Sequence, residues 1–232
     1  MRRSRMITIG VLVLGPIVVA CTSEGSAFTA GRAAASASQL QDPSPFAGSP
    51  YLGVLYNSVV EGEIWERPEL SKRDRSLITV AVLQALDLDQ LSEEIIRGLD
   101  HGLTAEGISE TILQTAFYAG FPTGKKASGV AGAVFQGRGI SLAPIEGSWV
   151  PPNVQPQART SGGYAAVSRL GELRDVLLYG DVWERPGLSK RDRSMVTVAV
   201  LQALNRSELA GHQGRAMDNG VTAQELREIV LH

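Results

Sequence analysis

Cysteine is almost absent from this chain. Cys21 is the only cysteine among 232 residues, so no disulfide can form within the chain and no Cys-x-x-Cys pair is present. A reactive thiol also needs a neighbouring base or cation that lowers its pKa, and the sequence around Cys21 offers none. Dithiol redox chemistry within one chain is therefore excluded.

Paired metal ligands and cofactor motifs are missing as well. The three histidines, His101, His212 and His232, do not fall at a ligand spacing such as His-x-x-x-His. No glycine-rich phosphate loop follows a strand-like segment. We therefore predict neither a metal nor a cofactor.

Neither sign of charge dominates. The chain has 22 Lys and Arg against 24 Asp and Glu, a net charge of −2. Proteins that bind nucleic acids use an excess of Lys and Arg to neutralise phosphates. The composition argues against nucleic acid as a partner, and the length fits two modest domains.

The N-terminal apolar run, residues 6–20, is too short for a spanning helix of ~20 residues. It follows three arginines within the first five residues, and this order is typical of a signal peptide. The run ends in Val-Val-Ala before Cys21, which resembles a bacterial lipobox. We predict a signal peptide over residues 1–21 with lipidation at Cys21; a plain secretory signal with a chance cysteine is the alternative.

These features predict an exported protein, periplasmic or at the cell surface, whose only membrane contact is a lipid anchor at Cys21. Residues 22–49 are rich in Ser, Ala and Gly and contain Pro43 and Pro45. We interpret them as a flexible tether between the anchor and the folded part.

The strongest positive feature is a stretch that occurs twice. Residues 65–86 read WERPELSKRDRSLITVAVLQAL, and residues 183–204 read WERPGLSKRDRSMVTVAVLQAL. Each residue of the second copy lies 118 positions after its match, as Trp183 follows Trp65. Two copies this far apart indicate a duplicated domain rather than a solenoid.

One copy predicts a helix boundary followed by a buried helix. Pro68 disfavours the α conformation at Arg67, so a preceding helix should end there. Ser71 can cap the next helix, with Asp74 at the third position. That helix is apolar on nearly all sides from Leu77 onward, which is typical of a central, buried helix.

No segment shows a useful run of strand alternation, so we predict an all-α protein. We expect a first helix over residues 51–63, a third that ends near His101, a fourth capped by Thr104 and a fifth over residues 125–135. In the second copy we expect a helix over residues 164–180. We place the first domain at residues 50–139, a proline-rich linker at 140–163 and the second domain at 164–232.

The second copy ends early, because His232 matches Gln114 and residues 115–139 have no counterpart. We expect either a fragment, which we favour, or a partner subunit that covers the gap. A continuation resembling Phe-Tyr-Ala-Gly-Phe-Pro is expected to complete the second site.

The motifs resemble one known family. The W-E-R-P-x-L-S-x-R-D-R-S run with its apolar helix, the N-G-V-T-x-x-E-L-R-E run at residues 219–228, and Tyr-Ala-Gly-Phe-Pro at 118–122 are similar to the carboxymuconolactone decarboxylase family. The resemblance covers about residues 55–137 and 173–232. It implies two tandem carboxymuconolactone decarboxylase-like, alkyl hydroperoxidase D-like helical domains, the second truncated at the C-terminus.

The resemblance also implies activity and assembly. The family contains cofactor-free decarboxylases of small carboxylated molecules, and a related branch of thiol peroxidases that use a Cys-x-x-Cys and a nearby histidine. Its members form trimers or hexamers, so a homo-oligomer is expected, with the site between units. In the decarboxylases a histidine at the position of His212 is implied to transfer a proton; the first copy has Glu94 there, which departs from the pattern.

A carboxylate–arginine–histidine group is the resulting candidate site. Cations in the first turn of a helix oppose its dipole. Arg73 and Arg75 in the first turn of the repeated helix therefore need anionic partners, and Glu66, Asp74 or a bound carboxylate could serve. An arginine fork suits a substrate carboxylate. The predicted catalytic residues are His212, Glu184 and Glu66, and the predicted substrate-binding residues are Arg191, Arg193, Arg73 and Arg75.

Each of these residues has a structural alternative. The arginines and Glu66 can form an ion pair that ties one helix end to the next helix start, and His212 can be an ordinary helix residue. We interpret His101, His232 and Tyr118 as structural, and Gln84 and Gln202 as partners of backbone groups.

Three functions remain open: a cofactor-free lyase acting on a carboxylated lactone or related acid, a peroxidase-like member without the required cysteines, and a non-catalytic binding module of the cell envelope.

Overall fold

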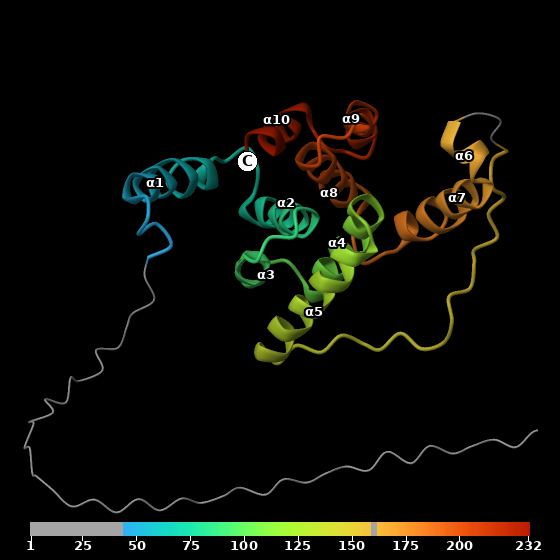
Figure 1. Cartoon of the computed structure of the whole chain (residues 1–232), viewed down its shortest axis with the longest axis horizontal. Helices are drawn as coiled ribbons and strands as arrows, with labels where there is room; N and C mark the ends of the chain where they lie inside the picture. Colours follow the sequence, from blue (N-terminus) through green and yellow to red (C-terminus); the bar gives the residue numbers. More distant parts are fainter. Residues whose placement is uncertain (1–43, 159–161) are drawn as a thin grey trace, which may run out of the picture. The chain divides into compact units, whose positions relative to one another are not determined.

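A computed structural model describes residues 44–158 and 162–232 of this chain (Figure 1). The predicted signal peptide, Cys21 and most of the predicted tether lie outside these residues. Within them the chain is helical and contains no strand, which confirms the all-α prediction. No helix of the described residues has both the length and the apolar character needed to cross a membrane.

The two copies fold into similar series of helices. The first repeat contains α1 (Pro50–Leu55), the π-helical turn η1 (Tyr56–Glu61), the 3₁₀ turn η2 (Ile64–Glu66), α2 (Lys72–Ala85), α3 (Leu91–Asp100), α4 (Ala105–Ala119) and α5 (Phe121–Gly137). The second contains α6 (Gly162–Ala166), α7 (Ser168–Leu173), the π-helical turn η3 (Arg174–Tyr179), the 3₁₀ turn η4 (Val182–Glu184), α8 (Lys190–Ala203), α9 (Leu209–Asp218) and α10 (Ala223–Leu231). No helix of the described residues matches α5 in the second repeat.

The predicted helix starts are present with their capping bonds. The Ser71 hydroxyl accepts a bond from the Asp74 backbone N–H at 3.1 Å, and Thr104 accepts one from Gly107 at 2.9 Å. Each cap satisfies a backbone donor that has no partner inside the helix. The third helix ends as expected: His101 is its C-cap residue, and Gly102 follows with φ +96°.

Two boundaries differ from the sequence prediction. Pro122 lies in the first turn of α5, where its missing N–H removes no helical bond, so α5 begins at Phe121 instead of residue 125. The helix expected over residues 51–63 is α1 continued by the wider turn η1, and α7 with η3 repeats this arrangement.

The two repeats share their hydrophobic cores. Helices α2 and α8 pack side by side, and α4 also contacts α8 (Figure 1). One core cluster joins Leu77 and Ile95 of the first repeat to Val196 of the second, and the other joins Ile78 to Met195. The tandem domains are therefore two halves of one compact unit over residues 45–232.

Two buried carboxylates each bind two arginines of the opposite repeat. Glu228 of α10 accepts bonds from Arg67 at 2.7 Å and Arg75 at 2.9 Å. In the matching arrangement, Glu110 of α4 accepts from Arg185 at 2.8 Å and Arg193 at 2.7 Å. Because each repeat makes the same contacts to the other, the two repeats are related by an approximate twofold axis.

A second set of ion pairs lies where α2 and α8 begin. Arg73 donates to Asp192 at 2.7 Å, and Arg191 donates to Asp74 at 2.9 Å. Each arginine also pairs with the aspartate beside it. The aspartates thus compensate for the cations that oppose the helix dipoles.

Stability should fall in acid because of these carboxylates. The two arginines hold the pKa of Glu228 down at about 2, against an ordinary value of 4.5, and arginines also lower the pKa of Glu110 and Asp74. A lowered pKa contributes stability that is complete above the unfolded-state value and is lost as the pH falls towards the folded-state value. We expect the urea midpoint to decrease steadily from about pH 5 to pH 2; a midpoint that stays constant over this range would contradict the assignment.

Candidate active site

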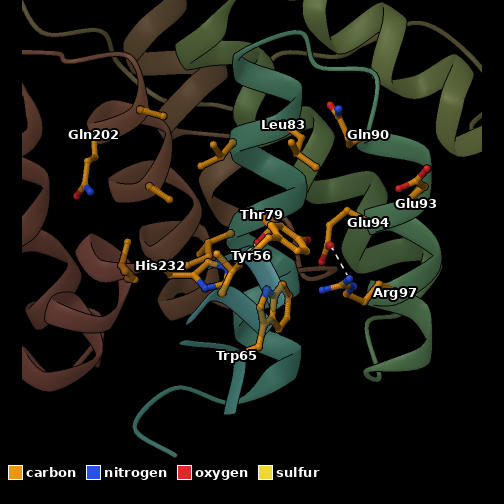
Figure 2. A pocket seen from close by; sticks show the side chains of 16 residues that line it. Tyr56, Trp65, Thr79, Leu83, Gln90, Glu93, Glu94, Arg97, Gln202 and His232 are labelled. Carbon is orange, nitrogen blue, oxygen red and sulfur yellow. Dashed lines mark hydrogen bonds and ion pairs between the residues drawn. The ribbon is translucent and has the colours of Figure 1, made fainter. Parts of the chain in front are cut away.

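Two cavities lie between the repeats, and the approximate twofold relation makes them counterparts. One, of about 950 Å³, contains His212 and Arg215 of α9. The other, of about 390 Å³, contains Glu94 and Arg97, the matching residues of α3 (Figure 2). We call them the His212 cavity and the Glu94 cavity.

Both repeats build the His212 cavity. Helix α9 supplies His212 and Arg215, and its N-cap residue Glu208 lies on the same side, four residues before His212. The opposite wall comes from the first repeat and includes Tyr118 and Phe121. The Tyr-Ala-Gly-Phe-Pro motif of the first repeat therefore lines the site of the second. The sequence analysis expected this motif from a continuation after residue 232; in the structure the copy in the first repeat lines the cavity.

His212 is buried, with 7% of its surface exposed, and its Nδ1 atom has no hydrogen-bond partner among the described residues. Its ring meets the Tyr118 ring edge to face, with centroids 5.5 Å apart. Burial lowers the pKa of His212 below its ordinary value of 6.5, and the nearby Arg215 charge lowers it further. A neutral imidazole with an open nitrogen is therefore available to a ligand near neutral pH.

Tyr118 presents a neutral hydroxyl to the same region. Burial raises the pKa of Tyr118 to about 12, so the phenol stays protonated. Its oxygen accepts a bond from the Trp183 indole N–H at 3.3 Å. This agrees with the structural interpretation of Tyr118 and also places the ring as a wall of the cavity.

Three arginines make the His212 cavity cationic: Arg174, Arg206 and Arg215. Arg174 lies 4.8 Å from the centre of the Tyr179 ring and pairs with Asp175, and Arg215 donates to the Tyr179 hydroxyl at 3.1 Å. Glu208 is the one carboxylate among the lining residues that the structure describes. This excess of guanidinium groups suits an anionic ligand such as a carboxylate.

The Glu94 cavity has a different charge. Glu94 is 7% exposed, and burial raises its pKa to about 7. Arg97 is held by Glu61 at 3.2 Å and lies over the Trp65 ring at 4.7 Å. It also forms an ion pair with Glu94 (Figure 2). His232 contacts the Thr79 hydroxyl through Nε2 at 2.7 Å, and burial lowers its pKa to about 4.

Comparison with known proteins gives the family. The profile of the carboxymuconolactone decarboxylase family matches residues 50–133 and 169–232, well over half of the chain. The chain belongs to the carboxymuconolactone decarboxylase family. The two matched segments correspond to the two repeats.

Two curated relatives match part of this carboxymuconolactone decarboxylase family member. A 4-carboxymuconolactone decarboxylase of Acinetobacter baylyi is 53% identical over 55 residues, which are 23% of this chain and 41% of that protein. The nitrosuccinic acid decarboxylase npaB of Metarhizium robertsii is 44% identical over 62 residues, 26% of this chain and 43% of that protein. The chain thus matches about two fifths of the length of either relative.

The carboxylate–arginine–histidine group predicted for this family member does not come together. Of its seven residues, only His212 lines the His212 cavity. The four predicted substrate-binding residues, Arg73, Arg75, Arg191 and Arg193, are held in the ion pairs between the repeats. In the structure these arginines neutralise buried carboxylates of the protein.

The two predicted catalytic glutamates lie on the surface. Glu66 pairs with Lys72, and Glu184 pairs with Lys190, with more than half of each glutamate side chain exposed. Neither lines the two cavities between the repeats. The alternative that the arginines form structural ion pairs agrees with the structure. Their partners are Asp74 and carboxylates of the opposite repeat, and Glu66 is not among them.

Other structural interpretations agree with the observed contacts. The His101 Nδ1 atom lies 2.9 Å from the Ser76 hydroxyl. Gln84 and Gln202 donate their side-chain amides to the Ile112 and Val230 carbonyls at 3.0 and 3.3 Å. His232, whose Nε2 contacts the Thr79 hydroxyl, also lines the Glu94 cavity.

Sequence reasoning missed the cavity arginines. Helical spacing from His212 would have found Arg215, and the repeat would have supported it because Arg97 matches Arg215. Arg174 has no such signal, because its match in the first repeat is Tyr56 and its helix is distant in sequence from α9.

Proposed function

We propose that this protein decarboxylates a small carboxylated acid or lactone in the His212 cavity. The observation that carries the proposal is the meeting of three arginines with a buried histidine whose Nδ1 is unpartnered. Membership of a decarboxylase family supports it, as do the names of the two matched relatives.

The reaction needs an electron acceptor inside the substrate. As the carbon–carboxylate bond breaks, its electron pair remains on carbon while carbon dioxide leaves. The names of the two relatives denote a carboxylated lactone and a nitro diacid. A conjugated lactone carbonyl or a nitro group can take up that electron pair without an added cofactor. The resulting carbanion equivalent then gains a proton.

The cavity residues divide these tasks between them. The arginines bind carboxylate oxygen and stabilise negative charge that moves onto the acceptor group. Protonated His212 donates its proton to carbon, and water restores that proton afterwards. Apolar side chains of α7 and η3, Leu170, Leu173 and Leu177, line the same cavity. An apolar surface disfavours a charged carboxylate and accepts neutral carbon dioxide, so contact with these side chains favours decarboxylation.

The direct test is carbon dioxide release by the purified chain. We expect turnover of a panel that contains 4-carboxymuconolactone and nitrosuccinate, with no added metal or reductant. A chain that binds these acids and leaves them intact would support the binding-module alternative instead. Peroxide consumption with a dithiol reductant is expected to stay at the level of a Cys21→Ser control, because the chain has no second cysteine.

Arg206 tests the role of the cationic wall. It lines the His212 cavity on an exposed segment before α9, and no protein carboxylate within the described residues forms a salt bridge with it. We expect Arg206→Gln to raise KM about 10- to 100-fold with a small change in kcat, since a hydrogen bond to a charged group contributes about 1.5–3 kcal/mol. Steady-state kinetics measures this split, and Arg138→Gln, which removes an exposed arginine elsewhere, is the control. An unchanged KM would remove Arg206 from substrate binding.

A further inference from the structure

The Glu94 cavity is a built pocket that the proposed decarboxylation does not use. It has a volume of about 390 Å³, within the range of small-molecule sites. Its apolar lining includes Val60, Ile78, Val82, Leu83, Ala199 and Ile229, which come from both repeats.

Glu94 supplies an open acceptor in this pocket. The residue is more than nine-tenths buried, and its Oε1 atom has no hydrogen-bond partner among the described residues. Its other oxygen forms an ion pair with Nε of Arg97 at 3.6 Å, and a side-chain hydrogen bond from Ser76 also stabilises the ionised carboxylate. A buried carboxylate oxygen without a donor is costly, and a ligand that donates to it would remove that cost.

The charge around Glu94 disfavours an anion. Arg97 is the one cation among the described lining residues, and Glu61 already pairs with it at 3.2 Å. Glu93 and Glu94 add further acidic groups. His232 adds no positive charge near neutral pH, because its pKa is about 4.

The repeat shows how the two cavities differ. Glu94 stands where the second repeat has His212, and Glu93 stands where it has Gly211. The η1 residue Tyr56 stands where η3 has Arg174. Each of these differences makes the Glu94 cavity less cationic than its counterpart. Tyr56 and Trp65 also bring aromatic rings to the Glu94 cavity (Figure 2), and aromatic rings favour cations.

We propose that the Glu94 cavity is a second ligand site that takes a small organic ammonium ion. The ammonium group donates to Oε1 of Glu94, and the carbon chain of the ligand lies against the apolar side chains of α2 and α8. The two cavities of one chain then bind ligands of opposite charge. The proposal does not depend on decarboxylation in the His212 cavity.

Binding is coupled to the ionisation of Glu94. Arg97 on α3 and Glu61 on η1 act directly on the charge of Glu94. The other titratable groups that line the same cavity are Tyr56 on η1, Glu93 on α3 and His232 at the C-terminal part of the chain. Because the pKa of Glu94 is about 7, the carboxylate is mostly protonated at pH 6 and mostly ionised at pH 8. A ligand that binds the ionised form binds about tenfold more tightly at pH 8.

Isothermal titration calorimetry of the purified chain with n-butylammonium, n-butanol and butyrate tests the site. We expect n-butylammonium to bind more tightly than the other two at pH 8 and to lose about tenfold in affinity at pH 6. Glu94→Gln should weaken ammonium binding about tenfold or more and abolish the pH dependence. Glu106→Gln, the same change at an exposed glutamate outside the cavity, should have a small effect, and His212→Gln should have none.

Equal or tighter binding of butanol or butyrate would overturn the proposal, as would ammonium binding that Glu94→Gln leaves unchanged. If Glu94→Gln does not fold, as judged by its thermal unfolding, the pH dependence of the unsubstituted protein decides: affinity that is constant from pH 6 to 8 overturns the proposal. None of these outcomes depends on decarboxylase activity.

Discussion

Replacing Glu110 by Gln is expected to lower the free energy of unfolding by about 3–5 kcal/mol. Glu110 is the carboxylate that Arg185 and Arg193 share, and the Arg193 side chain is fully buried. The substitution leaves the Arg193 charge in the interior without its counter-charge, which costs far more than a lost surface contact. Urea denaturation followed by circular dichroism measures the change.

Glu184→Gln is the matched control, because it makes the same chemical change at an exposed ion pair with Lys190. Exposed pairs of this kind contribute about 0–1 kcal/mol. If the two variants lose the same small amount of stability, the pairing of Glu110 with the opposite repeat does not hold the repeats together in solution.

Replacing His212 by Gln is expected to reduce kcat/KM by about 10²- to 10⁴-fold, the usual contribution of a general acid. The fold should survive, because no protein group within the described residues depends on the Nδ1 atom of His212. Steady-state kinetics and thermal unfolding separate the two effects. His232→Gln is the control: it introduces the residue that the first repeat carries as Gln114, and it lies in the Glu94 cavity.

The pH profile distinguishes proton donation from a packing role. Burial lowers the pKa of His212 below its ordinary value, so the protonated form in the free protein becomes populated as the pH falls. If this form donates the proton, kcat/KM rises as the pH falls through this pKa. His212→Gln should lose that rise. A variant that keeps both its turnover and its pH dependence would remove His212 from the chemistry.

Local sequence signals predicted the helices well. The caps at Ser71 and Thr104 are formed by short-range bonds that a few neighbouring residues determine. The apolar helix from Leu77 onward is buried, as its all-round hydrophobicity indicated. Such features need no knowledge of the partner helix.

The partners of the arginines were beyond local reasoning. The sequence showed that Arg75 and Arg193 needed anions, but Glu228 and Glu110 lie 153 and 83 positions away. The repeat indicated two like halves, while their approximate twofold packing became evident only in the structure. The sequence therefore left two interpretations open, a substrate-binding fork and a structural ion pair, and the structure shows these arginines in ion pairs between the repeats.

The wall of the His212 cavity shows the same limit. Tyr118 and Phe121 precede His212 by 94 and 91 positions, with a linker between them. Only the packing of α4 against α8 brings the first repeat to the second repeat's site. The difference between Glu94 and His212 at matching positions contributes to the different charge of the two cavities.

The central claim is that the His212 cavity, walled by both repeats, holds the reacting acid. A crystal structure with a saturated carboxylated lactone, which lacks the double bond needed for carbon dioxide loss, tests it most directly. We predict a ligand carboxylate on Arg206 or Arg215, with an imidazole nitrogen of His212 within hydrogen-bonding reach of the carbon that gains the proton. A ligand bound at Arg73 and Arg191 or at the Glu94 cavity, with the His212 cavity empty, would contradict the account.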